Sequence, residues 1–427
     1  MSKSITLNHI TKIEGHAKLN LGIEKNKVTR CELSATEGSR YFEGIVIGRN
    51  YTEAHELTSR ICGICSCAHV IAAITAIENA IGFIPSKQTI MLRELMTLGE
   101  RIRSHATHLY FLALPDYVGY ESALAMIPKF KPQLNNALLL MKHGNRIIKT
   151  LAARDLHPVS ATVGGWLKLP TEEQFTAMLH DLEALREPAN ATVKLFSSLE
   201  YPSFDTSGEM GGLKDAKKYA MLGGTFASEF ISFSPNDYRR YLTEEHREYS
   251  SSNFVTLKGN TFMVGALSRF NLSARQLHPK AQAWVKKSKL RLPSENPYLN
   301  NLAQAIEMVH CIEEGIILCK KMLREGINQE RHAVPKPKAG VGVGAIEVPR
   351  GTLWHEYAID SKGRIVNANI ITPTAQNLFN IQEDIRNVVP GIVHKKKEEI
   401  IMDIEKLIRS YDPCFSCSAH FLEVKWT

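Results

Sequence analysis

The chain has 427 residues, of which 44% are hydrophobic and 22% charged, and its formal net charge at pH 7 is +8. This composition is ordinary for a globular protein, and the length allows a large buried core. The charge is modest and spread along the sequence, which argues against a nucleic-acid or membrane-binding patch. Eight cysteines in so long a chain do not suggest a secreted disulfide framework. No apolar run approaches the roughly 18 residues of a membrane span, and the N-terminus lacks a signal-peptide core, so we expect a cytoplasmic protein.

The first part of the sequence predicts an N-terminal β segment (1–50). Residues 16–24 alternate apolar and polar side chains, and Lys25–Lys27 suits a hairpin turn. From Thr52 the spacing of apolar residues becomes helical. This change opens a helical core segment (51–200), which also contains the first of two cysteine motifs.

Four long helices are predicted inside that core segment. Nearly all residues of Val70–Ile81 are apolar, so this helix should be buried on most faces. Ser86 can cap the next helix, which we expect to run toward Leu114 and stop before Pro115. Further helices are expected at about 121–153 and 171–197.

The second half of the chain divides into a mixed peripheral region (201–270) and a segment (271–427) with helices, a β-meander and the C-terminal cysteine motif. The predicted elements of that last segment are helices at about 273–288, 299–325, 375–388 and 395–410, and strands within 341–372 that turn at Asp360–Gly363. We therefore predict a mainly α (α+β) fold, with a long central helix bundle, small peripheral β-sheets and one integrated catalytic unit.

Two Cys-x-x-Cys couples at opposite ends of the chain are its most informative feature. The first couple is Cys62 and Cys65, and the second is Cys414 and Cys417. A histidine follows each couple, so we expect four thiolates to converge on one metal centre. Zinc, an iron–sulfur cluster and a softer redox metal all accept thiolates. Structural zinc usually staples small modules, and a zinc-stapled, non-catalytic subunit of a respiratory-type complex is the alternative from a different class.

The two motifs resemble the signature pair of the large subunit of nickel–iron hydrogenases. The supporting motifs Lys12–His16 and Glu347–Gly351 occur in the same order as in that family. The related subunit of respiratory complex I has the same fold but lacks these cysteines. The resemblance implies an oxidoreductase that reversibly cleaves H2 into protons and electrons, and that passes the electrons to an iron–sulfur small subunit.

The resemblance also assigns the metal ligands. Cys62 and Cys414 would be terminal thiolates on nickel, and Cys65 and Cys417 would bridge nickel to an iron that carries carbon monoxide and cyanide. Cofactor-binding roles around this centre would fall to Pro349, Thr374, Asp412 and His69.

Three catalytic roles follow from the same resemblance. Cys414 would accept the first proton, and Glu14 would relay it outward. Arg350 would hang over the open metal position and supply positive charge, paired with Asp412. Taken alone, Glu14 and Arg350 would more often be surface or salt-bridged charges, and His16 a structural hydrogen-bonding residue.

A second metal site, for Mg2+ or Fe2+, is implied near the C-terminus. Its ligands would be Glu43, the carbonyl of Ile370, and His420. Such an oxygen-rich site suits a hard divalent ion. Glu37 is the alternative to Glu43 as the glutamate ligand, because both lie in one short segment.

The sequence departs from the family pattern at one functional position, where Ser104 replaces an aspartate. This change resembles the cytosolic, cofactor-coupled branches and removes one carboxylate partner of Arg350. The glycines of Gly340–Gly344 do not indicate a dinucleotide-binding loop, because a strand pattern instead of a helix follows them and they lack the G-x-G-x-x-G spacing. The remaining cysteines read as core residues: Cys31, Cys67, Cys311 and Cys319.

The resemblance implies several partner proteins. Electrons would pass through the iron–sulfur small subunit to diaphorase or ferredoxin-linked subunits, and maturation chaperones and an endopeptidase would assemble the centre. Family precursors are usually cut after the motif histidine, and residues 421–427 follow His420 here. An uncut, nickel-free precursor of the same subunit therefore remains an alternative, beside a member that keeps its tail.

Overall fold

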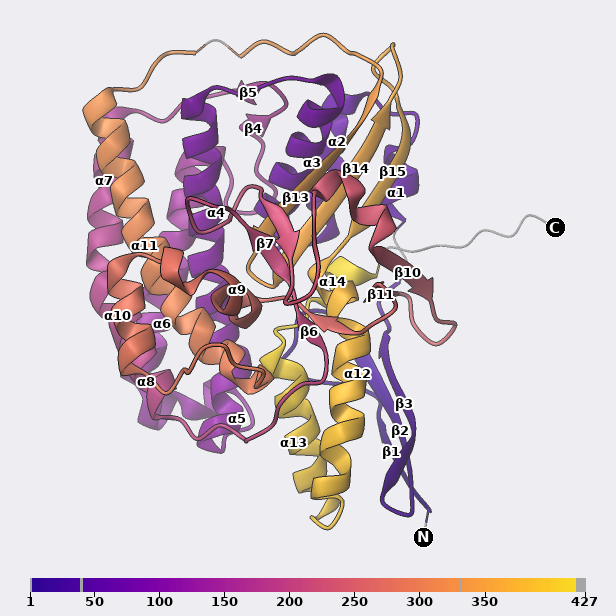
Figure 1. Cartoon of the computed structure of the whole chain (residues 1–427). Coiled ribbons are helices and arrows are strands. Elements are labelled where there is room, and N and C mark those ends of the chain that lie inside the picture. Colours follow the sequence, from indigo (N-terminus) through magenta and orange to yellow (C-terminus); the bar gives the residue numbers. More distant parts are fainter. Residues whose placement is uncertain (1, 39–40, 331, 420–427) are drawn as a thin grey trace, which may run out of the picture.

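The structure is a computed structural model that describes residues 2–38, 41–330 and 332–419. Most of it is helical (Figure 1). The helices are α1 (Phe42–Val46), α2 (Ala54–Thr58), α3 (Ser66–Ile81), α4 (Lys87–Thr107), α5 (Leu114–Val118), α6 (Ala123–Ala152), α7 (Glu172–Ala184), α8 (Arg186–Ser198), α9 (Ala266–Ser273), α10 (Pro279–Lys287), α11 (Asn300–Glu325), α12 (Pro373–Ile392), α13 (Lys397–Ser410) and α14 (Phe415–Ser418).

In the described part of the chain the strands form six small sheets, in the orders β1-β2-β3, β4-β5, β7-β8-β9, β10-β11, β12-β6 and β13-β14-β15. Among the described strands, β12 and β6 are the one parallel pair. The strands are β1 (Ser2–Leu7), β2 (Ala17–Glu24), β3 (Lys27–Ala35), β4 (Ala161–Thr162), β5 (Gly165–Trp166), β6 (Glu209–Met210), β7 (Gly212–Lys214), β8 (Thr225–Ala227), β9 (Ser232–Phe233), β10 (Leu242–His246), β11 (Asn253–Leu257), β12 (Phe262–Met263), β13 (Gly340–Val348), β14 (Gly351–Ile359) and β15 (Ile365–Ile371).

A helix bundle makes up one side of the molecule (left in Figure 1). There α11 packs against α4, α7 and α8, and α6 packs against α4 and α8. Side-chain caps begin these helices. Ser86, the predicted cap, accepts from the Thr89 amide, and Thr171 forms a capping box with Gln174 that was not predicted. The predicted mainly α (α+β) fold with a long helix bundle is confirmed.

The sheet β13-β14-β15 lies against α3, and its two longer strands are almost entirely buried. Gly342 shows why the contact is so close: a Cβ atom there would lie 2.2 Å from the carbonyl oxygen of Ala76 and 2.2 Å from the amide nitrogen of Ala80. Gly340 and Gly344 face α3 in the same way. The glycine run therefore lets a strand touch the backbone of a helix.

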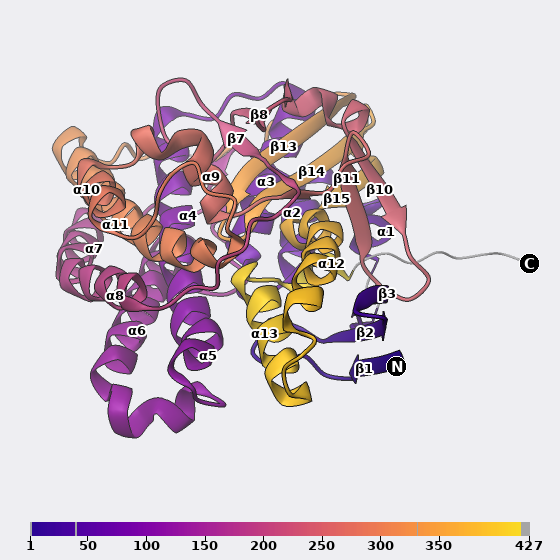
Figure 2. The ribbon, with the colours of Figure 1, turned by 60° about the horizontal axis from the view of Figure 1, so that its bottom comes forward.

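The C-terminal helices α12 and α13 lie beside one another, and α12 also contacts β3 and β11 (Figure 2). The predicted hairpin turn is present, with Lys25 and Asn26 at φ 47° and 63° between β2 and β3. The turn at Asp360–Gly363 is also present, since the Gly363 amide donates to the Asp360 carbonyl. Among the described residues, no helix combines the length and apolarity that a bilayer crossing requires.

Several predicted boundaries are wrong. Pro115 does not end a helix, because a π-helical turn at His108–Ala113 follows α4 and Pro115 then sits in the first turn of α5, where its missing N–H costs nothing. The helix expected at 171–197 is two helices that meet at Leu185. The first fifty residues also contain a short helix, α1.

Candidate metal centre

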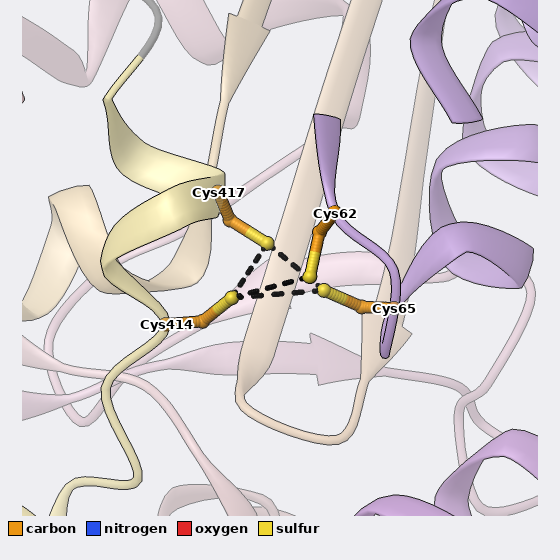
Figure 3. Close-up of side chains that lie close together, drawn as sticks. All are labelled: Cys62, Cys65, Cys414 and Cys417. Atoms are coloured by element: carbon orange, nitrogen blue, oxygen red, sulfur yellow. Dashed lines mark hydrogen bonds between the residues drawn. The ribbon is translucent and has the colours of Figure 1, made fainter. Parts of the chain in front are cut away.

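Four cysteine thiols meet in the interior of the protein. The Sγ atom of Cys414 lies 3.5 Å from that of Cys62, 3.8 Å from that of Cys65 and 2.8 Å from that of Cys417. The Sγ atoms of Cys65 and Cys417 are 2.9 Å apart. All four ligand atoms lie within 4.8 Å of one another, and all four residues are buried. Figure 3 shows the four side chains pointing toward a common point from two separate segments.

Each couple is placed by the start of a helix. Cys62 follows a 3-10 turn, and Cys65 is the N-cap residue of α3. Cys414 is the N-cap residue of α14, so Cys417 lies within the first turn. Asp412 adopts φ 50° directly after α13, and this left-handed residue redirects the chain toward the thiols.

The segment around Glu14 runs beside the second couple. Glu14 forms an isolated parallel bridge with Cys414, and its carbonyl accepts from the Phe415 amide at 2.9 Å. Gly15 has φ 81°, and a Cβ atom there would lie 2.7 Å from the Ser416 amide nitrogen. Only glycine therefore allows the N-terminal motif to approach the C-terminal one so closely.

The Glu14 carboxyl group reaches the sulfur cluster. Its Oε2 atom lies 2.9 Å from Cys414 Sγ and accepts from the Ser416 amide at 3.2 Å, while Oε1 lies 4.0 Å from Cys62 Sγ. Burial raises the pKa of Glu14, with a further rise from Cys62, and the contacts with Cys414 and Arg350 oppose it. A carboxyl group in this position can exchange a proton with a thiol.

Arg350 lies at the tip of the hairpin between β13 and β14, close enough to the thiols to interact with them electrostatically. Its Nη2 atom is 3.0 Å from Asp412 Oδ1, and its Nη1 atom donates to Ser104 Oγ at 3.3 Å. Ser104 therefore lies directly beside Arg350. The pKa of Arg350 stays well above its ordinary value, because Asp412 and the thiols outweigh the effect of burial. Its buried Nε atom has no acceptor among the described residues.

The other predicted cofactor-binding residues lie next to residues of this site. Pro349 precedes Arg350 at the hairpin tip, and Thr374 Oγ1 accepts from the Cys414 amide at 2.8 Å. His69 is buried one turn after Cys65, and its Nδ1 atom lies 3.0 Å from His355 Nε2. His69 is thus oriented by a ring nitrogen of β14, a contact that no sequence pattern indicates.

Two of the three residues predicted to bind a second ion, Glu43 and Ile370, lie next to each other. Glu43 Oε1 accepts from the Ile370 amide at 2.8 Å, so α1 and β15 meet at this point. His420 lies outside the described residues. The rival Glu37 instead lies 4.0 Å from His16 Nε2, and this placement favours Glu43.

The electrostatics of the four thiols fit a metal ion. Burial raises the pKa of Cys65 to about 11 and those of Cys414 and Cys417 well above the ordinary value, whereas neighbouring thiols, Cys414 first, lower that of Cys62. Four thiolates cannot share so small a buried volume without positive charge. A soft cation would supply that charge and hold all four deprotonated.

The remaining cysteines lie apart from this group. Cys31, Cys67, Cys311 and Cys319 are buried, as predicted for core residues. Sequence reasoning missed Gln304, which donates from Nε2 to Asp412 Oδ2 at 3.0 Å. A lone glutamine within a helical pattern carries no signal of such a role.

Comparison with known proteins gives a consistent family. The family model described as nickel-dependent hydrogenase matches residues 40–198 and 215–420. The chain is 37% identical over 424 residues to the sulfhydrogenase 1 subunit alpha of Pyrococcus furiosus, with 98% of each chain covered. It is 33% identical over 421 residues to the sulfhydrogenase 2 subunit alpha of the same organism, with 98% of this chain and 100% of the other covered.

A solved structure agrees with these relatives. The chain is similar to an NAD+-reducing nickel–iron hydrogenase in the H2-reduced state, with a TM-score of 0.88 and 26% sequence identity. The similarity covers 98% of this chain and 99% of that chain.

Proposed function

The chain belongs to the nickel-dependent hydrogenase family as a catalytic large subunit, and from this premise we propose which of its residues hold the metals and move the protons. The enzyme is an oxidoreductase that acts on H2. The observation that carries the proposal is the convergence of four buried thiols, from segments more than 340 residues apart, within 4.8 Å.

Cys62, Cys65, Cys414 and Cys417 would together hold nickel and iron. The four sulfur donors suit such soft metals, and their burial excludes water. When bound, this centre takes up H2 and accepts its electrons, which allows the H–H bond to break heterolytically. Thr374 Oγ1 accepts from the Cys414 amide, so its hydroxyl hydrogen could be donated to a ligand of the bound centre.

The proton would leave through Cys414 and Glu14. Cys414 Sγ holds the proton first, and Glu14 Oε2, at 2.9 Å, receives it next. The Ser416 amide donates to the same oxygen and stabilises the carboxylate after the proton has moved on. Arg350, held by Asp412, places a permanent positive charge beside the thiolates.

A second ion, Mg2+ or Fe2+, would be bound by Glu43, the Ile370 carbonyl and His420. The contact between Glu43 and the Ile370 amide supports this assignment, because it brings a carboxylate to the correct segment of β15. Carboxylate and carbonyl oxygens are preferred ligands of hard divalent ions.

The two electrons from each H2 would leave through an iron–sulfur small subunit. The relatives named above are alpha subunits, and the solved neighbour is an NAD+-reducing hydrogenase. We infer a hetero-oligomer with a diaphorase or ferredoxin-linked module, located in the cytoplasm. Maturation chaperones and an endopeptidase would load and close the site.

Infrared spectroscopy of the purified complex tests the metal centre directly. We expect stretching bands of metal-bound carbon monoxide and cyanide, together with nickel and iron in the metal analysis. Zinc in place of nickel, with no such bands, would show that the thiols form a structural site. Replacing one ligand, in Cys414→Ala, should abolish H2 oxidation, and wild-type turnover by this variant would contradict the assignment.

A further inference from the structure

The hairpin tip that carries Arg350 is held from behind by a buried arginine. Arg269, on α9, donates from Nη1 to the Val348 carbonyl at 3.0 Å and from Nη2 to the Pro349 carbonyl at 3.1 Å. These two carbonyl groups immediately precede Arg350. The guanidinium of Arg269 therefore fixes the backbone from which the Arg350 side chain extends.

A second guanidinium holds the next carbonyl group along the strand. Arg101, on α4, donates from Nη2 to the Glu347 carbonyl at 2.7 Å. The Glu347 carboxylate in turn lies 3.0 Å from Arg269 Nη1. Three consecutive carbonyl groups, of residues 347–349, are thus each bound by a buried arginine.

Both arginines are anchored to one carboxylate on α11. Glu307 accepts from Arg269 Nε and Nη2 at 2.7 Å each, and from Arg101 Nη1 at 3.3 Å. We name Arg101, Arg269, Glu307 and Glu347 the hairpin clamp. The paired forks give a fixed geometry that a flexible ammonium group could not reproduce.

The hairpin clamp is fully buried and balanced in charge. Each of its four side chains is at most 1% exposed, and two cations face two carboxylates. Gln304, one turn before Glu307 on α11, also holds Asp412, the partner of Arg350. The same helix therefore fixes both the backbone of Arg350 and the carboxylate to which its side chain is paired.

Removing these charged groups from water costs free energy that their mutual attraction largely only offsets, so the cluster adds little net stability. We therefore interpret the cluster as fixing the geometry of the hairpin. It is unsuited to carrying protons. Burial opposes the ionisation of Glu307, but Arg101 and Arg269 outweigh it and hold the pKa of Glu307 well below its usual range. Burial also lowers the pKa of the adjacent His105 to about 4.

We propose that Arg269, supported by Arg101 and Glu307, is a positioning residue that sets where the Arg350 guanidinium lies over the four thiols. The inference rests on the proposed role of Arg350 at the metal centre. A displaced positive charge would change the field at the metal-bound ligands and the stabilisation of charge during turnover.

The test compares Arg269→Lys with Arg93→Lys in the holoenzyme complex. Arg93 is the matched control, because it is buried and makes a bidentate pair with Glu78, at 2.7 Å for both bonds, and among the described residues it has no hydrogen bond or ion pair with the hairpin. Both variants replace a buried guanidinium group with an ammonium group that cannot form the same paired hydrogen bonds, so both should lower the thermal unfolding temperature.

Only Arg269→Lys should change the metal centre. We expect full nickel and iron content, shifted carbon monoxide and cyanide bands, and a kcat lower by about 10-fold to 100-fold. Arg101→Lys, which loosens one carbonyl group instead of two, should change both readouts less. In Arg93→Lys, bands and kcat should match those of the wild type.

Unchanged bands and kcat in Arg269→Lys would overturn the inference, as would equal changes in Arg93→Lys. If Arg269→Lys does not fold, Arg101→Lys decides by the same criteria. A wild-type complex without carbon monoxide and cyanide bands would refute the proposed function instead, so the two failures are distinguishable.

Discussion

Glu14 has two carboxyl oxygens with different surroundings, and this asymmetry suits a relay. Oε2 is the atom nearest Cys414 Sγ, and it also receives the Ser416 amide, whereas Oε1 faces Cys62 at the longer distance of 4.0 Å. Its raised pKa lets the carboxyl group hold a proton closer to neutral pH than an exposed glutamate does.

We predict that Glu14→Gln retains nickel and iron but lowers H2 oxidation by about 100-fold or more, because the amide keeps the shape and loses the proton-accepting group. Turnover and metal content of the purified complex check this. Glu37→Gln is the control, since Glu37 lies near His16 and is not among the described hydrogen-bond partners of the four thiols; it should behave as the wild type. Full turnover in Glu14→Gln would place the relay elsewhere.

Asp384 makes stability depend on pH at a distance from the thiols. It accepts from Thr206 Oγ1 at 2.7 Å and from the Tyr411 hydroxyl, and burial raises its pKa from 3.8 to about 6. The folded state therefore binds a proton more tightly than the unfolded chain. This contribution to stability is present below about pH 4 and is lost as pH rises through about 6.

The difference in unfolding free energy between the wild type and Asp384→Asn should accordingly fall by roughly 3 kcal/mol from pH 4 to pH 7, at about 1.4 kcal/mol for each pKa unit. Denaturant titrations across that range measure it. A difference that stays constant with pH would contradict the raised pKa.

At the contact between α3 and β13, a strand packs directly against the backbone of a helix. Gly342→Ala would place a methyl group 2.2 Å from two backbone atoms of α3. Backbone atoms cannot move aside as a side chain can, so we predict a loss of about 3 kcal/mol or more. Thermal unfolding measures this loss.

Gly391→Ala is the matched control for that substitution, because Gly391 lies in α12 with no atom near an added Cβ. It should be neutral or stabilise the protein by up to about 1 kcal/mol, as alanine favours helices. Equal unfolding temperatures for Gly342→Ala and the wild type would show that β13 can retreat from α3.

Local patterns predicted the elements whose signals are local. The cap Ser86 and the hairpin turn at Lys25–Asn26 depend only on neighbouring residues, and both predictions are confirmed. Pro115 was misjudged because the preceding π-helical turn restarts the helix, which no pattern of apolar residues reveals. The role of Gly342 depends on a partner more than 260 residues away, and it too could not be read from the sequence.

At the scale of the whole molecule, the site residues that belong to sequence motifs could be predicted. The residues that only the fold brings to the site could not. The four cysteines, with Glu14 and Arg350, stand in recognisable motifs. Arg269 and Glu307 lie in ordinary helical stretches, and only the packing of α9 against α11 brings them behind the hairpin. A residue that only positions another residue belongs to no motif with a recognisable spacing, so the sequence alone does not reveal it.

The metal centre should also couple the two ends of the chain. Cys62 and Cys414 are 352 residues apart in sequence, so metal bound by both couples would tie the start of α3 to the start of α14. A ligand that binds only the folded state adds its binding free energy to stability. We predict that enzyme produced without nickel is less stable than the loaded enzyme by roughly 3 kcal/mol or more, the value expected once ligand exceeds about 100 times its Kd.

Hydrogen exchange followed by mass spectrometry locates this effect. Exchange in the nickel-free enzyme should rise together in residues 60–67 and 412–418, because releasing either couple frees both segments. The bundle helix α7, which contributes no ligand, should exchange at the same rate in both forms and serves as the internal control. A rise confined to one of the two segments would mean that the thiols do not share one metal centre.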